Sequence, residues 1–322
     1  MGSVVALAGQ IGGSKLADGL YRLRAQDLTV IVNTGDDFQH LGLSIAPDLD
    51  SVVYALVGIA SASAGWEPEG ETRAVHGMLT ALGGPDRPII GDKSLATALL
   101  RTEWLRSERG LTHVTLELCR RMGVQARVLP MSDDPVCTQV LTDDGAVSFR
   151  EYFNDLGCEP VVRGFHYAGA ADARLSDEVL DALHAHDLEA VVICPANPYH
   201  AIRPILEVNG MRALLRKRGA PVVAVSPIVG GKALKGSAGK IMRELGREPS
   251  ALSVAGDYRG IIDGFVLDKE DAKLADPVRS LGMQVLVTST VMRTDESRLS
   301  LARAVLDFAR DCRETKAAAV QS

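Results

Sequence analysis

Aromatic side chains, cysteines and long apolar runs are scarce in this sequence of 322 residues. The five cysteines are odd in number, widely spaced and without a C-x-x-C pair, which indicates reduced thiols in a cytosolic protein. The longest uncharged stretch, residues 51–66, is short for a membrane span and contains several Ser and Gly. No basic residue precedes the apolar residues 4–8, so no signal peptide is visible. We therefore expect a cytoplasmic protein without a membrane partner.

Long basic runs are lacking as well. The 35 Lys and Arg are dispersed and the net charge is −6, which argues against a nucleic-acid partner bound through its phosphates. Glycine, in contrast, is abundant at 31 residues, within an ordinary globular composition of 46% hydrophobic and 24% charged residues. Many glycines suit a protein whose backbone closely approaches a ligand at several places.

The order of apolar segments predicts an α/β fold. An apolar strand at residues 4–8 precedes a helix with Leu16, Leu20 and Leu23 on one face, and a second strand follows at residues 28–32. This βαβ unit implies a parallel sheet. Further strands are predicted at residues 126–129, 190–194, 222–225, 264–267 and 284–287. The expected fold class is a Rossmann-like, three-layer α/β/α arrangement with a mostly parallel sheet.

Two additions to this core are predicted. Residues 51–123 read as a helical insertion, in which Asp92 and Thr112 can each cap a helix and Gly123 follows a helix end. Residues 136–141 and 146–153 alternate around an Asp-Asp-Gly turn, which predicts a β-hairpin. We expect one domain over residues 1–315 and a flexible tail over residues 316–322.

A glycine-rich loop follows the first strand. Gly9, Gly12 and Gly13 precede Lys15 between a strand and a helix, where free backbone N–H groups favour a phosphate. The pattern is neither a Walker A loop nor a complete dinucleotide-binding fingerprint. By itself it fits either a phosphate site or a tight turn.

Carboxylates follow the second strand. Asp36 and Asp37 lie just past its carboxyl end, where open α/β sheets bind ligands, and residues 47–50 add Asp48 and Asp50. Two acidic groups at one crevice repel each other unless a cation or proton lies between them, and Mg²⁺ prefers such oxygen ligands. The alternative is that Asp48 and Asp50 only cap the next helix.

Two later strands are also followed by loops that contain proline or glycine. Residues 194–198 (CPANP) and 226–232 (SPIVGGK) can present side chains and N–H groups to a ligand, or can simply stop the strands. His40 and His200 lie near these loops and are candidate contacts. His184 and His186 are spaced i, i+2 on a predicted helix, so they point apart and do not suit a metal.

Taken together, these loops resemble those of the 2-phospho-L-lactate transferase family, which acts in the biosynthesis of the deazaflavin coenzyme F-420. The resemblance extends from about residue 4 to about residue 308, and the matching segments occur in the same order as in the family. It rests on the segments GQIGGSK, NTGDD with PDLD, GDKSLATALL, LPMSDDPV, ICPANPYH, VSPIVGGK and DGFVLDKED.

The resemblance implies an enzyme that joins two small molecules. A guanosine diphosphate ester of lactate, enolpyruvate or glycerate would be the donor, and the deazaflavin alcohol FO the acceptor. The ribityl hydroxyl of FO would attack the distal phosphorus and GMP would leave, with Mg²⁺ as cofactor and a homodimer as the usual assembly.

The resemblance also suggests residue roles. We expect Asp36, Asp37 and Asp50 to hold Mg²⁺, with one carboxylate able to accept the hydroxyl proton. For the donor phosphates it suggests Gly12, Gly13 and Lys15, and for the donor's guanosine Asn197, Ser226, Gly230 and Gly231. On the acceptor side it suggests Asp92, Thr97 and His40.

The sequence departs from the family pattern at one position, and two other protein classes are considered as alternatives. The family usually has glycine where this chain has Gln10, which fits the turn if its φ stays negative, and the identity of the donor acid stays open. A related branch of non-catalytic nucleotide-sugar binders, the gluconeogenesis-factor branch, is disfavoured by the GDD…PDLD and MSDD segments. A nicotinamide-dependent dehydrogenase is disfavoured by the missing third glycine.

Overall fold

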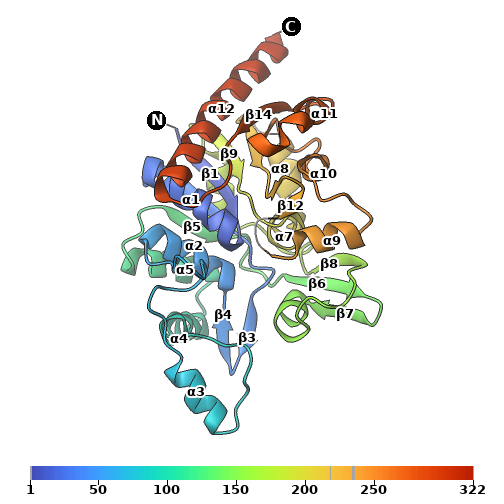
Figure 1. Ribbon diagram of the computed structural model, residues 1–322. Coiled ribbons are helices and arrows are strands. Elements are labelled where there is room, and N and C mark those ends of the chain that lie inside the picture. The colour runs from blue at the N-terminus through green and yellow to red at the C-terminus, as the bar shows by residue number, and fades with distance from the viewer. Residues whose placement is uncertain (1, 218, 234–235, 322) are drawn as a thin grey trace.

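A seven-stranded, all-parallel sheet forms the centre of the computed structural model, which describes residues 2–217, 219–233 and 236–321 (Figure 1). All six neighbouring strand pairs are parallel, which confirms the expected fold class. In spatial order the strands are β14 (Gln284–Thr288), β13 (Gly264–Asp268), β10 (Val222–Val225), β9 (Ala190–Ile193), β1 (Val4–Ala8), β2 (Leu28–Val32) and β5 (Arg127–Pro130).

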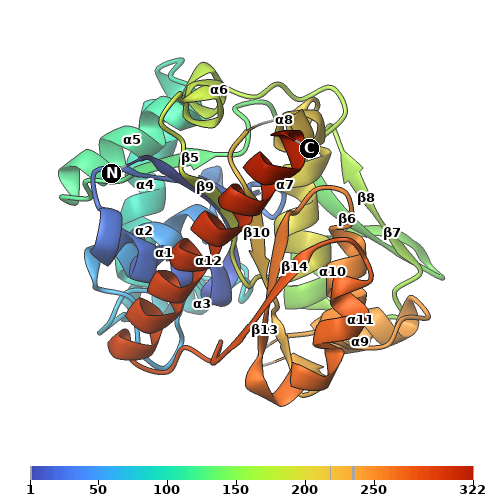
Figure 2. The same cartoon turned by 90° about the horizontal axis from the view of Figure 1, so that it is seen from above.

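Helices cover both faces of this sheet. Every residue of β1 is buried, and its side chains alternate between two hydrophobic cores. One core takes side chains from α1 (Gln10–Arg24), α2 (Pro47–Val57) and α12 (Asp295–Gln321), and α12 packs along α1 (Figure 2). The opposite core includes α6 (Asp177–His184), α7 (Arg203–Glu207), α8 (Met211–Lys217), α9 (Ala238–Glu244), α10 (Ala251–Asp257) and α11 (Ala275–Arg279). Burial on both faces explains why several of these strands are continuous apolar runs rich in β-branched residues.

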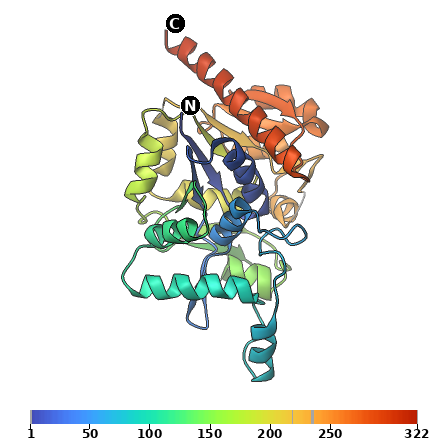
Figure 3. The same ribbon diagram turned by 90° about the vertical axis from the view of Figure 1, so that its left-hand side faces the viewer.

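The insertion between β2 and β5 is helical, as predicted. Besides α2 it contains α3 (Ala74–Ala81), α4 (Asp92–Arg106) and α5 (Leu111–Arg121). A short hairpin of β3 (Phe38–His40) and β4 (Leu43–Ile45) precedes them and was not expected. Helix α3 buries none of its residues and projects from the body of the protein (Figure 3).

Two predicted helix caps are wrong. The N-cap positions of α4 and α5 are Gly91 and Gly110. The carboxylate of Asp92 instead accepts the N–H groups of Ala74 and Val75, and so caps α3. Thr112 lies inside α5, where its N–H donates to Asp133 at 2.6 Å.

The end of α5 is as expected. Gly123 has a φ of 77° immediately after the helix, the left-handed conformation that glycine adopts most readily.

The predicted hairpin is confirmed, with its turn at residues 143 and 144. Strands β6 (Cys137–Thr142) and β7 (Gly145–Ser148) pair, and β8 (Gly164–Ala168) joins them in a separate antiparallel sheet. The second arm is shorter than expected, because a π-helical turn, η1 (Glu151–Asp155), follows it.

Most of the expected tail, residues 316–321, belongs to the last helix. Helix α12 continues through Gln321, whereas Ser322 lies outside the described residues. Within the described ranges, no helix combines the length and apolarity needed to cross a membrane.

Candidate functional site

The centre of the sheet contains a topological switch point. From β1 the chain passes through α1 to β2 on one side, whereas β9 pairs with the other side of β1. The segments that follow β1 and β9 therefore diverge at the carboxyl edge, where open α/β sheets bind ligands. Gly12 allows close packing here, because a Cβ atom at this position would collide with the carbonyl oxygen of Pro195.

The expected glycine loop after β1 is in fact the start of a helix. Helix α1 begins at Gln10, so Gly12, Gly13 and Lys15 lie in its first two turns, and Lys15 donates to the carbonyl of Met292 at 3.1 Å. The φ of Gln10 is 56°, so the condition that it stay negative is not met. A left-handed residue other than glycine costs about 1–2 kcal/mol. The surrounding contacts of Gln10 must offset this strain.

Asp48 supplies one of these contacts. Its Oδ1 accepts the Gln10 N–H at 2.9 Å, and its Oδ2 accepts Asn33 Nδ2 at 2.9 Å. The same Asn33 Nδ2 also donates to the carbonyl of His200 at 3.2 Å. Asp48 thus caps α1 rather than its own helix α2, and ties together the segments that follow β1, β2 and β9.

His200 lies in the π-helical turn η2 (Pro198–Ile202) after β9 and is only 2% exposed. Its ring stacks on Phe149 with centroids 3.7 Å apart, its Nε2 lies 3.1 Å from Gln10 Nε2, and its Nδ1 lies 3.3 Å from Asp36 Oδ2. Because the Gln10 amide nitrogen can only donate, a neutral ring accepts at Nε2 and carries its proton on Nδ1. His200 then donates to Asp36 and fixes its orientation.

Asp36, Asp37 and Asp48 form what we call the carboxylate cluster. Asp36 Oδ1 and Asp37 Oδ1 are shielded from solvent and accept no hydrogen bond from the described residues. Burial raises the pKa of Asp37 well above its usual value, against the opposing effect of Arg101. Burial and the nearby Asp36 charge raise the pKa of Asp48 to about 6. Such a cluster is stabilised by a proton or a cation.

Asp50 is engaged elsewhere. It forms a buried ion pair with Arg101, whose side chain is 1% exposed and also donates to the carbonyl of Ser44 at 3.2 Å. The unpaired oxygens at this site are therefore those of Asp36 and Asp37.

The residues suggested for the donor's nucleoside mostly have local partners. Asn197 Oδ1 accepts the N–H of Tyr199, and Ser226 Oγ closes a turn with Ile228. The Gly230 N–H donates to Asp271, and Gly230 and Gly231 have φ values of 58° and 75° in the tight link between β11 (Ile228–Val229) and β12 (Lys232–Ala233). These residues follow β9 and β10, on the side of the switch point away from β2.

The residues suggested for the acceptor lie in the insertion. Asp92 caps α3, Thr97 accepts a hydrogen bond from the hydroxyl of Tyr54 at 2.8 Å, and His40 lies on β3. Partial burial, with the Arg150 charge nearby, lowers the pKa of His40.

An aromatic row leads away from His200. Phe149 stacks on His200 and also on Phe153, at 5.9 Å between centroids. Phe153 is 51% exposed and lines a cavity of about 520 Å³ together with Arg87 and Leu156. We call this space the Phe153 cavity. The stacking of Phe149 and Phe153 had no local signal in the sequence.

The cluster can hold a cation only with help from other ligands. No three His, Cys, Asp or Glu side chains in the described part of the chain are arranged to hold a metal by themselves. The two unpaired Asp oxygens nevertheless suit Mg²⁺, which commonly binds one or two carboxylates and completes its shell with water and substrate phosphates.

The family model and the curated relatives that match this chain indicate the same family of transferases. A family model described as 2-phospho-L-lactate transferase CofD matches residues 4–303. A 2-phospho-L-lactate transferase of Methanopyrus kandleri is 39% identical over 94% of this chain and 96% of its own, and one of Methanosarcina mazei is 36% identical over 94% and 99%. A phosphoenolpyruvate transferase of Streptomyces griseus is 37% identical over 96% and 99%.

A crystal structure provides a fold match. A UPF0052-family protein of Bacillus halodurans superposes with a TM-score of 0.62 over 95% of this chain and 99% of its own, at 17% identity. At this identity the likeness shows a shared fold alone.

Proposed function

The chain belongs to the CofD family of 2-phospho-L-lactate transferases, enzymes that transfer a phosphate-containing group, and we propose that it acts on the deazaflavin FO in coenzyme F-420 biosynthesis. In this proposal the ribityl hydroxyl of FO attacks the distal phosphorus of a guanosine diphosphate ester of a small acid. The bond from that phosphorus to the bridging oxygen breaks, GMP leaves, and a phosphodiester joins FO to the acid. Relatives are named for two different acids, so the proposal covers lactyl, enolpyruvyl and glyceryl donors.

The observation that carries the proposal is the pair of unpaired, solvent-shielded oxygens, Asp36 Oδ1 and Asp37 Oδ1, at the switch point. We propose that Asp36 and Asp37 hold Mg²⁺ and that Asp50 supports them indirectly, by positioning Arg101. When bound, the cation would neutralise charge on the oxygens of the diphosphate.

The chain's own residues would position the reacting groups. His200 holds Asp36 through its Oδ2, whereas Oδ1 has no partner among the described residues and would accept the hydroxyl proton of FO. The first turns of α1, with Gly12, Gly13 and Lys15, would face the donor phosphates, because the N-terminus of a long helix favours anions. Asn197, Ser226, Gly230 and Gly231 would face the guanosine.

The acceptor would lie on the insertion side. The aromatic row from His200 through Phe149 to Phe153 supports a position for the flat deazaflavin ring in the Phe153 cavity. His40, Thr97 and Asp92 would border this acceptor region.

We further propose a cytoplasmic homodimer. The five free cysteines fit a reducing compartment. Exposed apolar side chains on α3 and α4, among them Met78, Leu82 and Leu99, support a contact with a second copy.

Magnesium is expected to stabilise the protein more strongly at about pH 8 than at about pH 5, because protons compete with the cation for raised-pKa carboxylates. The folded pKa of Asp48, about 6, exceeds its unfolded value. Its contribution to the free energy of unfolding is therefore lost as the pH rises from about 4 to about 6. Bound Mg²⁺ should restore stability above that range, by about 1–3 kcal/mol at 10–100 times its Kd.

Calorimetric unfolding at the two pH values, with and without MgCl₂, measures this effect. NaCl at matched ionic strength controls for general screening. Equal stabilisation by Mg²⁺ at both pH values would argue against binding at the carboxylate cluster.

A further inference from the structure

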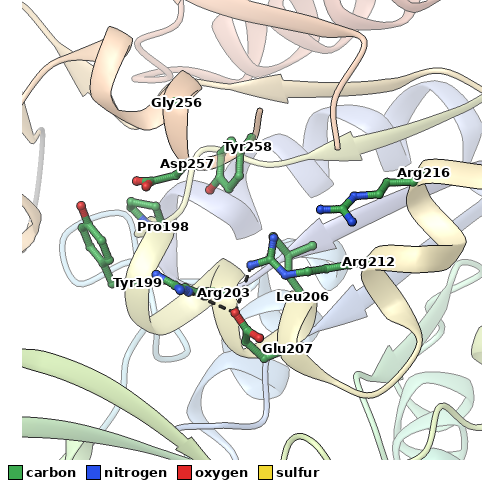
Figure 4. Close-up of a pocket in the computed structure, with 10 residues that line it drawn as sticks. All are labelled: Pro198, Tyr199, Arg203, Leu206, Glu207, Arg212, Arg216, Gly256, Asp257 and Tyr258. Carbon is green, nitrogen blue, oxygen red and sulfur yellow. Dashed lines mark hydrogen bonds and ion pairs between the residues drawn. The ribbon is translucent and has the colours of Figure 1, made fainter. Parts of the chain in front are cut away.

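A second cavity, of about 420 Å³, lies between α7, α8 and the carboxyl end of α10 (Figure 4). Arg203 of α7 and Arg212 and Arg216 of α8 line it, so we call it the arginine cavity. None of the carboxylate cluster lines it. Tyr199 is part of its wall, whereas the next residue, His200, contacts Asp36.

Positive charge in the arginine cavity exceeds its local compensation. Glu207 Oε1 accepts both Arg203 Nε at 3.1 Å and Arg212 at 3.0 Å. Asp257, the second carboxylate of the wall, is paired with Arg247, which is not a lining residue. Arg216 has no hydrogen-bond or ion-pair partner among the described residues. One available carboxylate thus faces three guanidinium groups.

Further donors point into the same space. Figure 4 shows the guanidinium groups of Arg212 and Arg216 and the hydroxyl of Tyr258 directed toward the interior of the cavity. Tyr258 is nearly buried, at 3% exposure, and is part of the cavity wall. A hydroxyl directed into a cavity can donate a hydrogen bond to a ligand there.

The chemistry of these donors selects the class of ligand. Guanidinium groups match the geometry of phosphate oxygens and bind them through paired hydrogen bonds. The cavity volume lies in the range of small-molecule sites, and Leu206 and the Tyr258 ring add an apolar wall beside the arginines.

We propose that the arginine cavity is a binding site for a phosphate group, carried by a small organic molecule or present as the free anion. This site is separate from the switch point and does not depend on the proposed transferase reaction. The phosphate would pair with Arg216 and with the N–H groups of Arg203 and Arg212 that Glu207 leaves free.

Amide NMR shifts of the full-length protein test this proposal locally. Gly256 lines the cavity, and its backbone amide is expected to shift in a saturable way as inorganic phosphate or AMP is added. Adenosine, which lacks the phosphate, should leave it unmoved. Tighter binding of AMP than of phosphate would identify a phosphate ester as the ligand, and equal binding would identify the free anion.

Arg216→Gln should weaken this binding about tenfold, since a hydrogen bond to a charged group is lost. The variant removes no hydrogen bond or ion pair within the described chain, and Arg216 is exposed, so the fold should persist. Arg303→Gln is the matched control, because Arg303 is an exposed arginine of α12 away from the cavity. The proposal is overturned if the Gly256 amide does not move at millimolar phosphate and AMP, or if Arg216→Gln binds as tightly as the unmodified protein.

Discussion

Replacing Asp36 with Asn is expected to lower turnover by about 10²–10⁴-fold, the range for a group that moves a proton in the transition state. Asn keeps the size of the side chain but removes the negative charge and the unpaired Oδ1 that we assign to the cation and the hydroxyl proton. His200 can still donate a hydrogen bond to the amide oxygen of Asn, so the fold should be retained. The rate of GMP release measures the loss, and circular dichroism checks the fold.

Asp144→Asn is the matched control for this variant. Asp144 is exposed in the turn between β6 and β7, where Asn-Gly serves as well as Asp-Gly. It should leave both turnover and fold unchanged. If the Asp36→Asn protein released GMP at the unmodified rate, Asp36 would have no part in the reaction.

Replacing Arg101 with Met is expected to lower the free energy of unfolding by about 3–5 kcal/mol, the usual cost of leaving a buried charge without its partner. Arg101 is 1% exposed, pairs with Asp50, and lies near enough to Asp37 to oppose the rise of that carboxyl's pKa. Denaturant unfolding monitored by fluorescence measures the change. The double variant Arg101→Met, Asp50→Leu should recover much of the loss, because no charge of this pair is then buried alone.

Arg106→Met provides the comparison on the same helix. Arg106 is exposed, and its one hydrogen bond to the described residues is a long one, 3.5 Å, to the carbonyl of Gly42. Its replacement should therefore change the free energy of unfolding very little. If Arg101→Met lowered the free energy of unfolding as little as Arg106→Met, the ion pair with Arg101 would not account for the buried charge of Asp50. Asp50 would then again be a candidate ligand of Mg²⁺.

The sheet was predictable because its signal is local. Strands such as β9 and β10 are buried on both faces, and this burial produces continuous runs rich in β-branched residues that can be recognised without knowledge of their partners. Strands β3 and β4 have three residues each and are only partly buried, so they carry no comparable pattern.

Helix caps could not be predicted from the neighbouring sequence alone. Asp92 stands at the start of α4, which suggests that it caps that helix, yet its carboxylate reaches the first turn of α3, 17 and 18 residues earlier in the chain. Asp48 likewise caps α1, across 38 residues. A carboxylate can satisfy any helix end within reach, and only the packing of the helices decides which one.

The position of the carboxylate cluster could be predicted from the sequence, whereas the pairing of its side chains could not. Asp36 and Asp37 stand out because they follow a buried strand at the edge where ligands bind. The Arg101–Asp50 ion pair spans 51 residues, and the contact between His200 and Asp36 spans 164. The positive φ of Gln10 likewise depends on Asp48 and His200, which hold the residue from distant parts of the chain.

The central claim is most directly tested by the reaction itself. The protein is incubated with FO, Mg²⁺ and, in turn, the guanosine diphosphate esters of lactate, enolpyruvate and glycerate, and the products are identified by mass spectrometry. We expect GMP and a new FO phosphodiester to form in equal amounts with at least one donor. The absence of an FO phosphodiester with all three donors would contradict the proposed function.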